Sequence, residues 1–252
     1  MSCYSLALPS SNERFLTKSF TVEDIIDLNS LINNIDVAGI DLFVEAKFKE
    51  YTKNNYKLFN VDKFCYLLSQ RIFAVSEKLE LKRGENDHYT MYLAKLYNDI
   101  IKDDFILENE IKYKNNVIKI KYPYNLNDSD KIYAYLDDEE RVSLSDLPVN
   151  CYKDVLSFYE KNEKLIVQDY FREVFNFNFS LENMIFLEVI QFLFQENINS
   201  IYNNFFTLIH DYNYDIQSLK KFTLRELYLH IIVVNNYNKQ KQKNKKQYEP
   251  GT

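Results

Sequence analysis

Glycine, proline and tryptophan are scarce in this chain, which has three glycines, four prolines and no tryptophan among its 252 residues. Loops that cradle phosphate groups need glycines at short, fixed spacings, because backbone amides must approach the ligand closely. Gly39, Gly84 and Gly251 each stand alone. The sequence therefore excludes a Walker loop and a dinucleotide-binding fingerprint.

Cysteine is also scarce. Cys3, Cys65 and Cys151 are far apart, odd in number and not part of a Cys-x-x-Cys pair. This pattern argues against a disulfide framework and against a thiolate zinc site. We expect small buried thiols in a reducing compartment.

Long apolar runs are missing as well. A membrane-spanning helix needs about 20 apolar residues, but the longest candidate, residues 184–194, is shorter and is interrupted by Glu188 and Gln191. The first residues lack the positive segment and uninterrupted apolar segment of a signal peptide. We expect a soluble, intracellular protein with no membrane partner.

The charge balance is mildly acidic, with 31 basic and 37 acidic residues and a net charge of −6. Domains that bind nucleic acid carry a basic footprint, so we expect no nucleic-acid partner. The exception is the C-terminal end, which holds a cluster of lysines: Lys239, Lys241, Lys243, Lys245 and Lys246. Residues 236–252 are predicted to be a disordered lysine-rich tail.

The N-terminal part predicts a β-hairpin followed by helices. Two short alternating apolar stretches flank a turn at residues 9–12. Thr21, with Asp24 three residues later, predicts the cap of a helix. Its apolar residues recur at helical spacing: Val22, Ile25, Ile26, Leu28, Ile32 and Ile35. Further elements are predicted as helices at residues 41–51, 60–75 (capped by Asn60) and 87–101 (capped by Asp87), and a strand at residues 77–82.

The middle and the C-terminal part differ in pattern. Alternating residues around a turn at residues 114–116 predict a β-hairpin, and the acidic stretch 125–148 predicts a surface excursion with a short strand at residues 132–136. From residue 149 onward the spacing is helical, with Ser180 as one predicted cap. Thr223 and Glu226 form a capping box for the last helix, which should bury Leu227, Tyr228 and Ile231.

Together these patterns predict an α+β protein that is predominantly α-helical. It has an N-terminal β-hairpin plus helices, a central β-hairpin and a C-terminal helical bundle. The predicted organisation is an N-terminal lobe (1–104), a central hairpin and acidic excursion (105–148), a C-terminal helical lobe (149–235) and the tail (236–252).

Motifs that carry chemistry are absent from the sequence. His88, His210 and His230 are isolated, and His210 and Asp211 should point apart as neighbours on a helix. We predict no catalytic, cofactor-binding or metal-binding residues and no enzyme activity. One alternative stays open, an acidic metal site assembled from Asp137, Asp138 and a histidine.

Two segments carry a resemblance. They are LPSSNERFLTKSFTVEDIIDL at residues 8–28 and NVDKFCYLLSQRIFAVSEKLELK, with Arg71, at residues 60–82. In this order and spacing they resemble the baseplate hub assembly proteins of T-even-type contractile-tailed bacteriophages. SLKKFTLRELYLHI, at residues 218–231, fits the same group more loosely. The resemblance covers residues 4–82.

The resemblance implies a non-enzymatic assembly catalyst, or chaperone, that helps hub, spike and tape-measure proteins come together in the host cytoplasm. It also implies absence from the mature virion. A permanent structural subunit of the hub is the alternative, and a homo-oligomer stays open. The C-terminal helices carry wide stripes of Phe and Tyr, so the predicted partner-binding residues are Phe192, Phe205, Phe206 and Tyr228.

Overall fold

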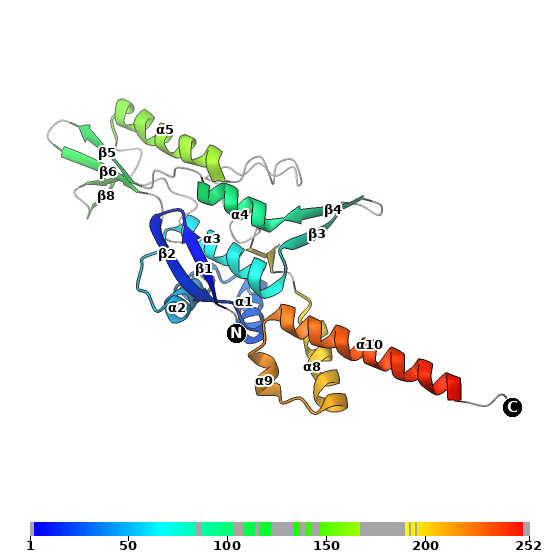
Figure 1. Cartoon of the computed structure of the whole chain (residues 1–252). Coiled ribbons are helices and arrows are strands. Elements are labelled where there is room, and N and C mark those ends of the chain that lie inside the picture. The colour runs from blue at the N-terminus through cyan, green and yellow to red at the C-terminus, as the bar shows by residue number, and fades with distance from the viewer. Residues whose placement is uncertain are drawn as a thin grey trace.

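The structure is a computed structural model of the chain. It describes residues 3–83, 87–102, 108–113, 116–121, 134–136, 140–142, 147–166, 190–191, 193–194 and 196–248. Within these residues the fold is α+β and mainly helical, as predicted. Figure 1 shows the N-terminal hairpin and helices, the central strands and the C-terminal helices in the expected order.

The N-terminal hairpin covers three helices. Strands β1 (Cys3–Leu8) and β2 (Ser11–Lys18) are antiparallel, and their alternate side chains enter the core. Helices α1 (Val22–Asn33), α2 (Val37–Thr52) and α3 (Asn60–Gln70) pack behind them. Every residue of α3 is buried, and the helix continues into a π-helical turn, η1 (Arg71–Val75).

Three predicted details in this region are wrong. Ile35 is not on the buried stripe, because α1 ends at Asn33 and Ile35 adopts a positive φ of 54° at the surface. Asn60 is not a cap, since the carboxylate of Asp62 accepts the Phe59 N–H instead, at 2.9 Å. Asp87 begins a strand, because residues 87–92 pair with the preceding strand and this pairing overrides the helical period.

That pairing joins β3 (Lys78–Arg83) to β4 (Asp87–Tyr92), after which α4 (Leu93–Lys102) begins. The central hairpin consists of β5 (Glu108–Tyr113) and β6 (Asn116–Lys121), and β7 (Ala134–Leu136) and β8 (Glu140–Val142) extend it to four antiparallel strands. Helix α5 (Val149–Ile166) covers this sheet with Cys151, Val155 and Phe158, which form small clusters with Ile118 and Ile120.

The main core is shared by the two ends of the chain. One continuous cluster of buried side chains extends from Tyr4 to Val234 and includes α8 (Ile198–Tyr212), α9 (Ile216–Lys220) and α10 (Leu224–Tyr248). Helix α5 packs on the central sheet instead. Elements of the predicted 149–235 lobe therefore contribute to two different cores.

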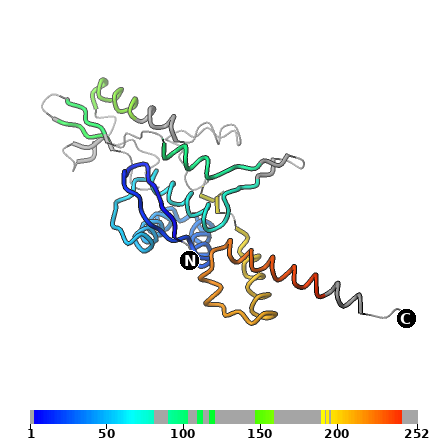
Figure 2. Tube along the Cα trace, in the orientation of Figure 1, coloured from blue at the N-terminus to red at the C-terminus, as the bar shows by residue number. Residues whose placement is uncertain are grey.

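The predicted disorder from residue 236 is wrong for most of that segment, because α10 continues to Tyr248. Lysine and glutamine have good helix propensity, and a helix that is already nucleated extends at little cost. The helix leaves the body of the molecule and projects outward (Figure 1, Figure 2). Residues 249–252, the predicted Ser180 cap and the turn residues 114–115 lie outside the described residues.

Candidate functional site

Helix α10 begins next to the start of α1. The Thr223 N–H donates to Glu226 Oε2 at 2.7 Å, and the Glu226 N–H donates to Thr223 Oγ1 at 3.1 Å, which confirms the predicted capping box. The Val22 N–H donates to the carbonyl of Phe222 at 2.7 Å. The first turn of α10 is therefore fixed to the N-terminal helices.

Arg71 of η1 links the same helices to the chain before α8. Its Nε donates to the Leu193 carbonyl at 2.7 Å, and its Nη2 lies 3.8 Å from Glu196 Oε1. Burial lowers the pKa of Arg71, and the Glu196 charge opposes that shift. Glu196 Oε2 also accepts the Tyr228 hydroxyl at 3.3 Å. Burial and Glu196 raise the pKa of Tyr228 to about 12.

Further contacts hold the inner face of α10 along its first half. The Tyr214 hydroxyl lies 2.9 Å from His230 Nδ1, and the Phe222 ring stacks on His230 with 4.9 Å between centroids. The Tyr212 hydroxyl donates to Asn238 Oδ1 at 2.8 Å. These contacts position α10 from its first turn to Asn238.

The outer face of the same segment is apolar and exposed. The outer stripe, as we call it, consists of four residues whose exposed fractions lie between 54% and 67%: Leu229, Ile232, Val233 and Tyr237. At about 100° per residue these positions share one side of the helix, opposite the buried Leu227 and Val234. A helix that is apolar on both faces is normally covered on both. The outer stripe is therefore the candidate contact surface.

The stripe differs from other exposed apolar residues in the described part of the chain. Leu16, Ile35 and Leu42 are as exposed, but they come from different elements, and scattered residues of this kind need no explanation. Helix α8 has a smaller apolar ridge, in which the rings of Phe206 and His210 stack with 5.5 Å between centroids. Among the side chains that the structure describes, only those on α10 include four such residues that follow the helical period.

The exposed pair on α8 also corrects a prediction. His210 Nδ1 lies 2.8 Å from Asp211 Oδ1, although the two residues were predicted to point apart. Their side chains bend toward each other from adjacent positions, and both are well exposed to solvent. An exposed pair of this kind contributes about 0–1 kcal/mol, and no third group in the described contacts completes a catalytic arrangement.

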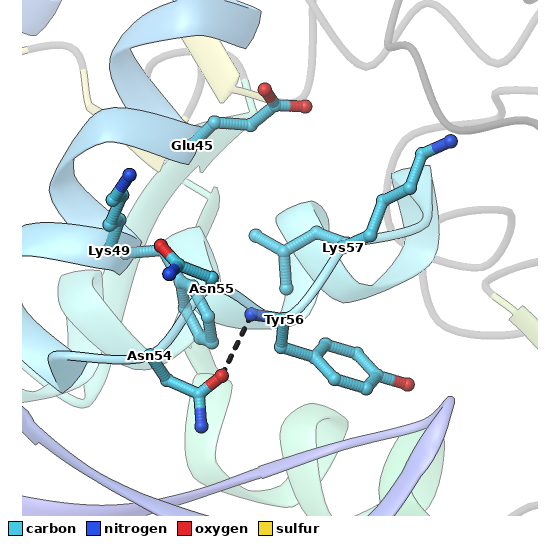
Figure 3. Close-up of a pocket in the computed structure, with 8 residues that line it drawn as sticks. Glu45, Lys49, Asn54, Asn55, Tyr56 and Lys57 are labelled. Atoms are coloured by element: carbon cyan, nitrogen blue, oxygen red, sulfur yellow. Dashed lines mark hydrogen bonds between the residues drawn. The ribbon is translucent and has the colours of Figure 1, made fainter.

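A surface pocket of about 250 Å³ lies between the end of α2 and the segment that leads into α3. Asn54 Oδ1 accepts the Tyr56 N–H at 2.8 Å, and the Tyr56 hydroxyl donates to the Ser10 carbonyl at 3.0 Å. Figure 3 shows that the charged ends of Glu45 and Lys57 do not converge on one point. The pocket is smaller than the 300–1,000 Å³ that is usual for ligand sites.

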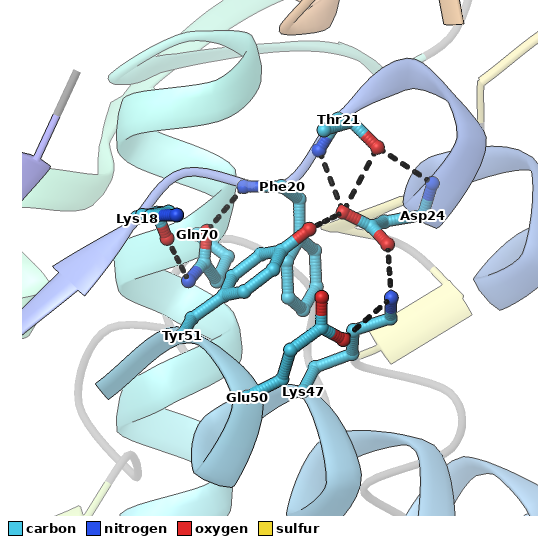
Figure 4. Close-up of polar contacts among 8 residues, drawn as sticks. All are labelled: Lys18, Phe20, Thr21, Asp24, Lys47, Glu50, Tyr51 and Gln70. Carbon is cyan, nitrogen blue, oxygen red and sulfur yellow. Dashed lines mark hydrogen bonds and ion pairs between the residues drawn. The ribbon is translucent and has the colours of Figure 1, made fainter. Parts of the chain in front are cut away.

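Buried charged side chains in the N-terminal half form hydrogen bonds and ion pairs with neighbouring side chains and backbone groups. Asp24 Oδ2 accepts the Thr21 N–H at 2.8 Å, the Thr21 hydroxyl at 3.0 Å and the Tyr51 hydroxyl, while Oδ1 pairs with Lys47 Nζ at 2.7 Å (Figure 4). Burial, together with Asp24, raises the pKa of Tyr51. Asp24 is on α1, whereas Tyr51 and Lys47 are on α2. The bonds of the Asp24 carboxylate therefore hold the two helices together.

A second buried charge also joins two helices. Lys63 of α3 is completely buried, and its Nζ lies 2.9 Å from Asp41 Oδ1 and 2.5 Å from Glu45 Oε1, both on α2. Among the described residues, no group of three His, Cys, Asp or Glu side chains is placed to hold a metal ion. The alternative site at Asp137 and Asp138 lies outside the described residues.

The predicted partner-binding residues fall in different environments. Phe192 lies outside the described residues. Phe205 is 2% exposed and packs in the core, so its ring is not accessible to a partner. Phe206 is 69% exposed on α8, and Tyr228 is partly buried against the core and bonded to Glu196. Phe206 and Tyr228 therefore lie in different environments, one in solvent and one against the core.

The prediction missed the four residues of the outer stripe. The signal was present, because the segment LYLHIIVV, residues 227–234, is apolar at nearly every position. A helix that is covered on one side only would have polar residues on its other face, at regular positions within such a segment. Aromatic residues alone do not indicate this face, because three of its four residues are aliphatic.

Comparisons with known proteins add no identity: no protein family, curated protein or solved structure significantly matches the chain. None of the helices among the described residues is both long and apolar enough to cross a membrane.

Proposed function

We propose that the chain is a non-enzymatic assembly factor that promotes formation of the central hub of a phage tail baseplate through protein–protein contacts. The observation that carries this proposal is the outer stripe, an exposed apolar face on an anchored helix. The resemblance of residues 4–82 to baseplate hub assembly proteins supplies the biological setting. In that setting the factor acts in the host cytoplasm and does not enter the mature virion.

Co-expression of the chain with the hub, spike and tape-measure proteins of the same phage tests the proposal. We expect a complex with at least one of these proteins and a larger soluble fraction of that protein. If no complex forms and the solubility of every component is unchanged, the proposal is wrong. Variants Leu229→Ser and Val233→Ser should reduce complex formation, whereas Leu42→Ser, which changes an exposed leucine on α2, should not.

A permanent structural subunit of the hub is the second candidate. The outer stripe also supports it, because a surface that is apolar and pre-positioned suits lasting burial in an assembly. Purified mature particles separate the two candidates. An assembly factor is absent from them, whereas a structural subunit is present in a fixed ratio to the hub proteins.

A further inference from the structure

The outer stripe is followed along α10 by a block of positive charge. From Leu229 to Tyr237 the stripe extends about 12 Å at 1.5 Å per residue. Lys239 and Lys241 come next and are exposed, and the sequence adds Lys243, Lys245 and Lys246. No acidic residue lies between Glu226 and Glu249. The apolar and basic parts are thus consecutive segments of one helix.

This charge contrasts with the rest of the chain. Six basic residues and one acidic residue give α10 a net charge of +5. The whole chain has a net charge of −6, so the residues outside α10 carry −11. Charges interact over about 8–10 Å in physiological salt. The lysines therefore repel a basic partner and attract one that carries carboxylates next to the surface that covers the outer stripe.

Pairing with α10 of a second copy fits this helix poorly. In an antiparallel pair of α10 helices centred on Val233, Lys241 of one copy would lie beside Arg225 of the other, and the neighbouring Glu226 already accepts the Thr223 N–H of its own cap. A parallel pair would align the two lysine blocks. Both arrangements bring like charges together, which destabilises helix pairs.

A lipid surface also fits poorly. Helices that lie in a membrane interface carry their apolar face and their basic residues along the same length. Here the outer stripe ends at Tyr237, before the lysines begin. A nucleic acid would match the lysines but would leave the outer stripe uncovered.

We propose that α10 is a docking helix for a partner protein whose surface is apolar opposite Leu229–Tyr237 and rich in Asp and Glu opposite Lys239 and Lys241. This assignment rests on the proposed function, since it states the chemistry of the hub component that is bound. The outer stripe provides the area that is removed from water. The lysines set the direction of the partner along the helix and speed its association.

The experiment measures binding of the full chain to each purified hub, spike and tape-measure protein at about 0.05 M and about 0.5 M salt, conditions that differ strongly in screening. We expect one acidic component to bind and to weaken at high salt. The double variant Lys239→Glu/Lys241→Glu should weaken binding by about tenfold or more and reduce the salt dependence. The control Lys49→Glu/Lys153→Glu makes the same charge change on exposed lysines of α2 and α5 and should bind like the unaltered chain.

Other results overturn the assignment in distinguishable ways. If a component binds but the Lys239/Lys241 variant binds equally well, the acidic partner is wrong and the proposed function stands. If none of the components binds, both are wrong. Dimerisation that is lost in Leu229→Ser, or binding of the chain to phosphatidylglycerol vesicles, would replace the protein partner with a second copy or a lipid surface.

Discussion

Helices α1 and α10 begin side by side and with the same local device, but they serve different purposes. Each has a threonine cap with an acidic residue three positions later, Thr21 with Asp24 and Thr223 with Glu226. In α1 the acid is buried and also binds Lys47, so the helix is fixed within the core. Helix α10 is 25 residues long and exposes an apolar face from Leu229 to Tyr237. The cap determines where each helix begins, but packing against the rest of the chain determines whether the helix is buried or exposes a face.

The largest expected effect comes from removing the two acids of these caps in turn. Asp24→Ala should lower the free energy of unfolding by about 3–5 kcal/mol, because it leaves the buried partners of a charge unpaired. Glu226→Ala removes little beyond a cap and should cost about 0.5–2 kcal/mol. Denaturant titration of both variants measures the difference. Equal losses would mean that Asp24 is only a cap.

Two leucines in one helix test the two faces of α10. Leu227→Ala should cost about 2–5 kcal/mol, because it opens a cavity in the core. Leu229→Ala, two residues later on the outer face, should change stability by less than about 0.5 kcal/mol. Thermal unfolding of the free chain checks this pair. A large loss from Leu229→Ala would show that the outer stripe is covered within the chain.

Two tyrosines extend the comparison. The Tyr97 hydroxyl accepts the Ala7 N–H at 2.9 Å and donates to the Ala7 carbonyl at 2.7 Å, which joins α4 to the N-terminal hairpin. Tyr97→Phe leaves these groups unpaired and should cost about 1–3 kcal/mol. Tyr237→Phe, on the outer stripe, is the matched control and should have almost no effect in the free chain. Denaturant titration at neutral pH compares them, and a similar loss for both would contradict the assigned environments.

Tyr97 also predicts a pH dependence. Burial raises its pKa to about 12, from an ordinary value of 10.0. The folded state therefore holds this proton more tightly than the unfolded state, so the stabilisation is present below pH 10 and is lost as the pH rises toward 12. Tyr97→Phe should reduce the loss of stability over that range. An unchanged alkaline profile in this variant would contradict the raised pKa.

The smallest effect concerns the end of α1. Ile35 has a φ of 54°, a left-handed conformation that is strained for a β-branched residue. Ile35→Gly should remove that strain and, after the greater chain entropy of glycine is subtracted, raise stability by about 0.5–1 kcal/mol. Differential scanning calorimetry measures the change, and Ile35→Val, which stays β-branched, is the control. A loss of stability in Ile35→Gly would show that the conformation is not strained.

Local signals in the sequence predicted much of this fold. The helix cap at Thr21, the capping box at Thr223 and the N-terminal hairpin depend on residues within a few positions of each other, so the sequence alone predicts them. Strand β4 was missed because its pairing with β3, and not its own spacing, determines it. The continuation of α10 beyond residue 235 differs from the prediction, because a polar, lysine-rich segment is also typical of disorder.

The candidate site was harder to predict. Phe205 and Phe206 are adjacent and chemically identical, yet one lies in the core and the other in solvent. Which face of α10 is covered depends on contacts with α1 and η1, which lie far away in the sequence. A stripe of apolar residues shows that a helix has a contact face, but it does not show whether the chain itself covers that face.

Amide hydrogen exchange of the chain, alone and with the hub component that it binds, tests the central claim most directly. The claim is that the N-terminal half uses its buried charges for architecture while α10 presents a face for a partner. The account predicts that the partner slows exchange along residues 229–241 and leaves α1 to α3 unchanged. Slowed exchange confined to the N-terminal half, with α10 unaffected, would contradict it.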